Sequence, residues 1–243
     1  MDVDRLIAHR GDNTNYPENS YAGIEAALKA GAKYVEFDLQ MNADKTLIVF
    51  HDDDFVRMAN KDSSVFETSN AALKEISVHE PDKFSKQHYP TRVPHLDEVI
   101  KLFKAYPEAK ALVEVKVQSL EFWGLETVMK KLLASLEAIS KQAIVISYSA
   151  EALRYTQKNS RMKVGLVFNQ YLKKHLKAGM KIDPEYMICP YKIVPEKTLW
   201  KGDWQWVIYA INKEKDAKAW LNREDIDYIE TDDISLLLNA VND

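Results

Sequence analysis

Charged side chains recur at a spacing of two residues in two short apolar segments of the sequence. Glu36 and Asp38 form the first pair, and Glu114 and Lys116 form the second. Because strand side chains alternate between two faces, the members of each pair point the same way. Three carboxylates that converge in a cleft repel each other unless a divalent cation neutralises them. A site of oxygen ligands favours Mg²⁺ or Ca²⁺, with Mn²⁺ as a third candidate, over Zn²⁺. The spacing therefore predicts a metal site built from Glu36, Asp38 and Glu114.

The same spacing has a plainer interpretation. Glu36, Asp38, Gln40, Asn42 and Asp44 alternate along one segment, as they would on the water-exposed face of an amphipathic strand. For one pair alone, this interpretation is at least as good as metal binding. The repetition of the pattern at two strand ends favours the metal site.

Two histidines also stand at the ends of apolar segments. His9 and His51 each follow directly on such a run. A single histidine at this place is more often structural, but two of them beside the carboxylates form a candidate acid/base pair, since imidazole exchanges protons near neutral pH. The other four histidines and the lone Cys189 are expected to be structural.

The elements that must position these residues are short apolar runs that alternate with helix-periodic segments, which is typical of βα units around a parallel sheet. At 243 residues the chain has the length of one (β/α)₈ barrel. We predict an α/β fold, a distorted (β/α)₈ TIM barrel of one domain over residues 1–243, with an insertion at about 52–94 after the His51-Asp52 strand. The C-terminal strand ends of such a barrel form one active-site mouth, where the polar segments meet. The predicted strands are 5–9, 34–39, 46–51, 111–117, 143–148, 163–168, 186–189, 206–211 and 227–231. The predicted helices are 20–30, 96–105, 122–139, 151–158, 213–221 and 234–241.

One predicted strand is surplus to a barrel of eight. The run 46–51 follows its predecessor too closely for a crossover helix, so we expect it to be the second arm of a hairpin. If Asp44 and Lys45 are the two central residues of a tight turn, counting outward pairs His51 with Asp38. This register predicts that His51 lies at the edge of the metal site.

The composition excludes several classes of protein. Lys and Arg number 33 against 37 Asp and Glu, without a basic run, so nucleic acid is not an expected partner. The single cysteine, and an N-terminus without the basic and apolar regions of a secretory signal, favour a cytoplasmic protein. No apolar run approaches the roughly 20 residues of a transmembrane helix. The expected partner is a small-molecule substrate, and association into a homo-oligomer stays open.

Taken in order, these residues resemble the motifs of the glycerophosphodiester phosphodiesterase family. The ordered set spans essentially the whole chain and is far more specific than any single tripeptide. The motifs are His9-Arg10-Gly11, Pro17-Glu18-Asn19-Ser20, Glu36-Phe37-Asp38, His51-Asp52, Pro94-His95-Leu96-Asp97-Glu98, Glu114-Val115-Lys116, Ser147-Tyr148, Tyr209-Ala210-Ile211-Asn212 and Thr231-Asp232.

The resemblance implies a distorted (β/α)₈ barrel with a divalent metal and two catalytic histidines. Two departures concern the substrate mouth: Arg57-Met58-Ala59 stands for the family's Arg-Thr-Thr, and Tyr209 for its late tryptophan. A third is Asp44-Lys45, which replaces the usual Asp-Gly turn. They leave the chemistry intact and the substrate preference open. The implied metal ligands are Glu36, Asp38 and Glu114, the acid/base pair is His9 and His51, and the phosphate contacts are Arg10 and Lys116.

The leading hypothesis is metal-dependent hydrolysis of a glycerophosphodiester to sn-glycerol 3-phosphate and an alcohol, with the two histidines as acid and base. One alternative is a lysophospholipase D-like activity on a lipid phosphodiester, which requires an apolar entrance formed by Phe55, Phe66, Phe84 and Tyr89 of the insertion. The other alternative is a non-catalytic barrel that binds a phosphodiester or a protein partner. It ranks last because no key site residue is missing.

Overall fold

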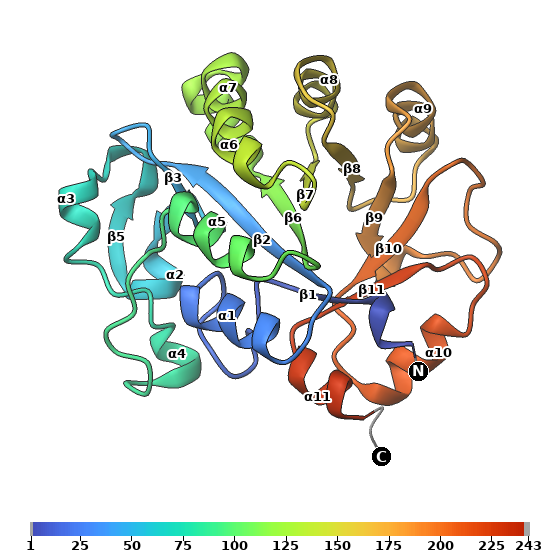
Figure 1. The fold of residues 1–243 in the computed structure, drawn as a ribbon, viewed down its shortest axis with the longest axis horizontal. Coiled ribbons are helices and arrows are strands. Elements are labelled where there is room, and N and C mark those ends of the chain that lie inside the picture. Colours follow the sequence, from blue (N-terminus) through green and yellow to red (C-terminus); the bar gives the residue numbers. More distant parts are fainter. Residues whose placement is uncertain (1, 241–243) are drawn as a thin grey trace.

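The computed structural model describes residues 2–240, and within them a nine-stranded sheet closes into a barrel (Figure 1). Eight strands pair in parallel with one another, and β3 pairs antiparallel with β2. The ring closes where β1 pairs with both β11 and β2. Helices connect successive strands and cover the outside, which confirms the (β/α)₈ architecture. The barrel strands are β1 (Leu6–Ala8), β2 (Tyr34–Met41), β6 (Lys110–Val115), β7 (Ala143–Ser147), β8 (Lys163–Val167), β9 (Tyr186–Pro190), β10 (Gln205–Tyr209) and β11 (Tyr228–Thr231).

The helices around the barrel are held by apolar stripes. In α5 (Leu96–Ala105) the buried side chains recur at spacings of three and four residues, so one face of the helix packs on the sheet. Helix α1 (Tyr21–Lys29) begins after Ser20, whose hydroxyl accepts a hydrogen bond from the Gly23 amide at 3.0 Å. The other barrel helices are α6 (Val117–Trp123), α7 (Leu125–Leu136), α8 (Ala150–Asn159), α9 (Lys173–Ile182), α10 (Glu214–Leu221) and α11 (Ile234–Asn239), and the 3₁₀ turns are η1 (Val3–Arg5), η3 (Glu137–Ile139) and η4 (Tyr191–Ile193).

Three helix predictions need correction. The single helix expected over 122–139 is wrong, because the chain forms α6 from Val117 and breaks at Gly124, whose φ of +83° is incompatible with a continuous helix. Val117 therefore belongs to a helix and not to the strand before it. Helix α9 was not predicted: its segment is rich in lysine, and only Gly179 and Ile182 of it are buried. The predicted helix 234–241 ends at Asn239, and Val241 lies outside the described residues.

The insertion builds a small apolar core of its own on the outer face of β3 (Leu47–Val49). Ile48 and Phe50 contribute to this core, so the hairpin connects it to the barrel. Phe55 is fully buried in it, which is incompatible with the predicted role of Phe55 in an apolar entrance. The elements of the insertion are β4 (Asp54–Phe55), α2 (Val56–Ala59), β5 (Lys61–Ser64), η2 (Val65–Glu67), α3 (Asn70–Leu73) and α4 (Pro81–Phe84).

The hairpin of β2 and β3 is present, but its predicted register is wrong by one residue. Phe50, and not His51, faces Asp38: the Phe50 amide donates to the Asp38 carbonyl at 3.0 Å. The turn holds three residues instead of two, because Lys45 adopts a left-handed φ of +55° and the Asn42 side chain accepts from two turn amides. His51 therefore follows the paired part of the hairpin.

Strand β2 changes partner halfway along one edge, which opens the barrel near the site. Its first two residues pair with β1, and its last three pair with β3. The backbone between them has no strand on that side, and the Asn19 side chain fills the place by accepting from the Asp38 amide at 3.0 Å. The distortion therefore lies at the residues that the sequence singles out for chemistry.

The inside of the barrel is layered. Aliphatic side chains fill its middle, with Ile7, Leu112, Ile144, Ile188 and Val207 among them. A larger apolar cluster lies between the sheet and the helices. In residues 2–240, no helix is both long enough and apolar enough to cross a membrane.

Candidate active site

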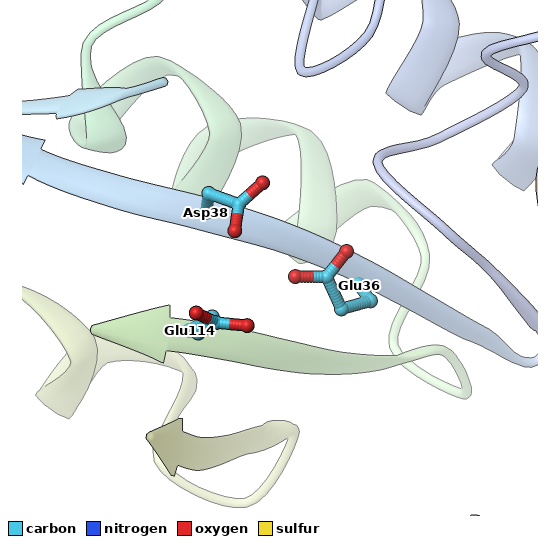
Figure 2. A group of neighbouring side chains, drawn as sticks. All are labelled: Glu36, Asp38 and Glu114. Atoms are coloured by element: carbon cyan, nitrogen blue, oxygen red, sulfur yellow. The ribbon is translucent and has the colours of Figure 1, made fainter. Parts of the chain in front are cut away.

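Three carboxylates converge at the C-terminal end of the barrel. Glu36 and Asp38 project from β2 and Glu114 projects from β6, with their side chains turned toward one another (Figure 2). One oxygen from each lies within 4.8 Å of the others. Asp38 and Glu114 are direct register partners, so the sheet itself sets this proximity. The arrangement can hold a divalent cation.

The alternative of a water-exposed strand face is wrong for this segment. Glu36 and Asp38 are 2% and 1% exposed, and Gln40 and Asn42 are fully buried. Gln40 donates from its side chain to the His51 carbonyl at 3.1 Å. Four of the five alternating residues are therefore buried, and Asp44, in the hairpin turn, is exposed as that interpretation expects.

A sharp corner after β1 places Arg10 beside the carboxylates. Arg10 and Gly11 both have positive φ, of 58° and 82°. A Cβ on Gly11 would lie 2.6 Å from the Gly23 backbone, so the corner requires glycine there. The Arg10 amide donates to Glu36 at 3.1 Å, and its guanidinium pairs with Asp38 at 3.1 Å and with Glu18 at 2.9 Å.

The charges at the mouth give the carboxyls very different pKa values. Burial alone would raise the pKa of Asp38, but Arg10 and Lys116 outweigh it and hold that pKa well below its usual range. Burial, and then the neighbouring charge of Asp38, raise the pKa values of Glu36 and Glu114. Lys116 is 7% exposed and donates to Glu114 at 2.8 Å and to Asp38 at 3.3 Å.

Each of the two histidines has its own aspartate. His9 Nδ1 lies 2.7 Å from Asp232, and His51 Nδ1 lies 2.6 Å from Asp52. A carboxylate at Nδ1 fixes the tautomer and leaves Nε2 as the free ring nitrogen. Burial and Arg10 lower the pKa of His9, but the Asp232 hydrogen bond and the nearby carboxylates outweigh them and leave that pKa raised.

The structure brings the residues singled out in the sequence to a single cavity of about 90 Å³. Asp38 lies behind this lining, where Asn19 donates to it at 2.8 Å. The apolar part of the lining comes from the later strands, and the hydroxyls of Tyr148 and Tyr209 lie 3.2 Å apart at the mouth. Polar side chains in the lining are His9, Arg10, Glu36, His51, Glu114, Lys116 and Glu230.

Sequence reasoning missed several residues of the site. Glu230 lies two residues after Tyr228 on β11 and shares its inward face, a signal that the alternation of that strand offers. The ion pairs of Arg57 with Glu18 and with Asp52 join the insertion to the mouth, and no local pattern announces them. Asp232 stands in a quoted motif, but its contact with His9 bridges opposite ends of the chain.

Known proteins resemble this chain in sequence and in fold. The model of the glycerophosphoryl diester phosphodiesterase family matches residues 9–236. A glycerophosphodiester phosphodiesterase of Caldanaerobacter subterraneus subsp. tengcongensis is 26% identical over 245 residues, covering 97% of both chains. A mouse protein named lysophospholipase D is 28% identical over 122 residues, which are 48% of this chain and 36% of that protein.

A solved structure of an Oleispira antarctica phosphodiesterase, in complex with the product sn-glycerol-3-phosphate, has the same fold. Its TM-score is 0.84 at 19% identity, with 99% of this chain and 98% of that chain covered. Sequence, family model and fold agree over nearly the whole length. The chain therefore belongs to the glycerophosphoryl diester phosphodiesterase family.

Proposed function

We propose that this phosphodiesterase hydrolyses water-soluble glycerophosphodiesters to sn-glycerol 3-phosphate and an alcohol in a reaction that depends on a divalent cation. The observation that carries the proposal is the convergence of three carboxylates, within 4.8 Å, beside two cations and two histidine–aspartate pairs. Metal-assisted phosphoryl chemistry uses such a combination.

The residues at the mouth fit a hard divalent cation. Glu36 Oε1 is buried and has no hydrogen-bond partner within the described residues, so it is available as a ligand. The carboxylates of Glu36, Asp38, Glu114 and Glu230 outnumber the nearby cations, which leaves negative charge for an ion to neutralise. Glu36, Asp38 and Glu114 would hold Mg²⁺ or Ca²⁺, with Mn²⁺ as a third candidate. When bound there, the ion offsets the charge that builds on the non-bridging phosphate oxygens.

Arg10 and Lys116 bind and orient the phosphate. Both side chains border the cavity and both are held in place by carboxylates, Arg10 by Glu18 and Lys116 by Glu114. A guanidinium fork and a point-charge ammonium both suit phosphoryl oxygens. They stabilise the additional charge of the transition state without contacting the alcohol.

His9 and His51 move the protons. One imidazole accepts a proton from the nucleophile as its oxygen bonds to phosphorus, and the other protonates the alkoxide that leaves when the second P–O bond breaks. Asp232 and Asp52 keep each ring in the tautomer that this requires. The raised pKa of His9 suits the role of the acid.

The nucleophile is water or the substrate's own 2-hydroxyl. Attack by the 2-hydroxyl forms a cyclic phosphate and releases the alcohol, and water then opens the ring. Direct attack by water forms no cyclic species. Trapping of a cyclic phosphate in single turnovers separates the two routes.

A second candidate is the hydrolysis of a lysolipid, in line with the mouse relative named lysophospholipase D. One observation favours it: Phe122 of α6 is 55% exposed and stacks on Phe66 of the insertion at a centroid distance of 4.6 Å. Together they form an apolar surface. Against this candidate, the burial of Phe55 removes part of the predicted entrance.

The proposal is tested by measuring turnover of glycerophosphocholine, glycerophosphoethanolamine and a lysophosphatidylcholine, with a chelator and after addition of Mg²⁺, Ca²⁺ or Mn²⁺. We expect turnover of the water-soluble diesters that disappears with chelator and returns with metal. Turnover in metal-free protein contradicts the metal requirement, and exclusive turnover of the lysolipid favours the second candidate.

A further inference from the structure

Glu230 is a buried carboxylate in the catalytic cavity for which the proposed reaction has no use. It lies on β11, lines the cavity and is 3% exposed. Its Oε1 atom is buried and has no hydrogen-bond partner among residues 2–240. A buried carboxylate oxygen without a partner is costly, which indicates that something other than the protein itself satisfies it.

Much of the cavity wall is aliphatic, so packing gives no reason for a charged side chain at Glu230. The cavity wall on the strands that continue around the barrel from β10 is aliphatic, with Val167 and Ile188 in the lining. On β1, the register partner of Glu230 is Ile7. Burial raises the pKa of Glu230 to about 7, in line with a position that an aliphatic residue would occupy more favourably.

Glu230 is not one of the three clustered carboxylates, although its charge, after burial and Asp38, contributes to the raised pKa of Glu36. The cluster of oxygens within 4.8 Å consists of Glu36, Asp38 and Glu114. Around the barrel, β1 separates β11 from β2, and both Glu230 and His9 line the cavity. Glu230 therefore borders the other half of the cavity.

This other half offers acceptors and hydroxyls to a ligand. Tyr209 of β10, the next strand, stacks on His9, and its hydroxyl lies 3.2 Å from that of Tyr148. A phosphate group is repelled by Glu230 and belongs beside Arg10 and the metal carboxylates. A neutral hydroxyl donates to a carboxylate without such a penalty.

We propose that Glu230 is a specificity-determining residue that accepts a hydrogen bond from the terminal glycerol hydroxyl of the substrate. This inference rests on the proposed function, since it assumes a phosphodiester bound at Arg10, Lys116 and the metal site. A glycerophosphodiester carries one hydroxyl next to its phosphate, which is a candidate nucleophile, and a terminal hydroxyl, which takes no part in either route and is free for recognition. A site built for a hydroxyl rejects the analogue that lacks it, because the buried acceptor is then left unpaired.

The test compares two substrates in two variants, Glu230→Gln and Glu230→Met. The substrates are glycerophosphocholine and 2-hydroxyethyl phosphocholine, which keeps the hydroxyl next to the phosphodiester, so that it can react by either route, and lacks the terminal hydroxyl. We expect the ratio of kcat/KM for the first to the second to fall about 10- to 100-fold in Glu230→Met, and less in Glu230→Gln, which keeps a carbonyl acceptor. The matched control is Tyr228→Phe on the same strand, which leaves the ratio unchanged. Equal losses on both substrates, or no loss, overturn the inference.

Binding to the unaltered protein gives a reading that does not depend on how the variants fold. In the presence of Mg²⁺, sn-glycerol 3-phosphate should bind about 10-fold or more tightly than 2-hydroxyethyl phosphate, and the difference should disappear in Glu230→Met and shrink less in Glu230→Gln. Equal affinities in the unaltered protein contradict the inference. A loss of Mg²⁺ affinity in Glu230→Gln as large as that in Glu36→Gln also contradicts it, because Glu230 is then a metal ligand. If the unaltered protein turns over neither diester with any metal, the proposed function fails instead.

Discussion

The two ends of the barrel place inward-pointing polar side chains by the same alternation but satisfy them differently. At the N-terminal end, Tyr34, Tyr186 and Tyr228 pack ring against ring, and the hydroxyls of Tyr34 and Tyr228 lie 3.3 Å apart. At the C-terminal end, carboxylates crowd together and buried oxygens of Glu36 and Glu230 have no partner within the described residues. The tyrosines at one end are neutral and contact one another, whereas the carboxylates at the other end are charged and include oxygens without a partner.

The difference shows which polar residues are there for the fold and which for a ligand. Neutral phenols bury apolar area and pair with each other, so they cost little. Buried carboxylates raise the free energy of the folded state unless an ion or a substrate completes them. Substitutions at the C-terminal end should therefore affect activity strongly, and substitutions at the N-terminal end should affect only stability.

The largest effect is expected for Asp38→Asn. Asp38 is a proposed metal ligand and also anchors Arg10 and Lys116, so kcat/KM should fall by about 10³-fold or more. Steady-state kinetics with saturating Mg²⁺ measure this loss. The matched control is Tyr34→Phe at the other end of the same strand, which should stay within about twofold of the unaltered protein. Similar losses in both variants would break the contrast between the two ends.

The next largest effect is expected for His51→Ala, which removes one of the two proton-transfer groups. Turnover should fall by about 10³-fold while Mg²⁺ affinity stays near its original value. His79→Ala, in the insertion and bonded locally to Ser77, serves as the control. A near-normal rate in His51→Ala would contradict the catalytic role of His51.

A smaller effect is expected for Lys116→Met, which keeps the length of the side chain and removes its charge. Turnover should fall by about 10²-fold, and by a similar factor for every glycerophosphodiester, because the proposed contact of Lys116 is with the phosphate. Lys110→Met at the opposite end of β6 should have little effect. A defect confined to one alcohol would assign Lys116 to alcohol recognition.

Asp232→Asn should have a milder effect and a diagnostic pH dependence. The hydrogen bond and charge of Asp232 help to raise the pKa of His9, so their loss lowers that pKa. The limb of the kcat/KM profile that reports His9 should move to lower pH, with a loss of about 10-fold at its optimum. Asp233→Asn, which changes a neighbouring helix cap, should leave the profile in place. If this limb does not move in Asp232→Asn, the pKa of His9 does not depend on Asp232 and the prediction is wrong.

The smallest effects concern stability and should have opposite signs at the two ends of β11. The pKa of Glu230 is about 7 in the folded chain, above its usual value near 4.3, so its protonated form stabilises the fold. That contribution is lost as pH rises through this window. In chelator at pH 7.5, Glu230→Gln should therefore raise the free energy of unfolding by about 2 kcal/mol, and the gain should vanish near pH 4.5. Tyr228→Phe should lower it by about 1 kcal/mol at both pH values. Urea denaturation measures both, and a loss of stability in Glu230→Gln at pH 7.5 would contradict this account.

Local patterns were sufficient to predict the barrel and most of its site. Alternation in β2 and β6 depends only on neighbouring residues, so it located Glu36, Asp38 and Glu114 without knowledge of the fold. The hairpin register failed because it depends on the left-handed conformation of Lys45, which no residue preference announces for a lysine. The error does not change the predicted set of site residues, because His51 follows the paired part of the hairpin and still lines the cavity.

Contacts between distant parts of the chain could not be predicted. Asp232 reaches His9 because β11 closes the ring beside β1. The orphan oxygen of Glu230 is a property of its surroundings and has no signature in the sequence. The burial of a side chain and its contacts with distant residues therefore become known only from the structure. Residue types and the alternation of strand faces can be read from the sequence.

The central claim is that Glu36, Asp38 and Glu114 hold the cation on which turnover depends. Calorimetric titration of chelator-treated protein with Mg²⁺ and with Ca²⁺, with turnover measured in the same samples, tests it most directly. We predict one ion per chain, turnover that rises with occupancy, and a large loss of affinity in Glu36→Gln with the fold retained. Full turnover in metal-free protein, or unchanged affinity in Glu36→Gln, would contradict the claim.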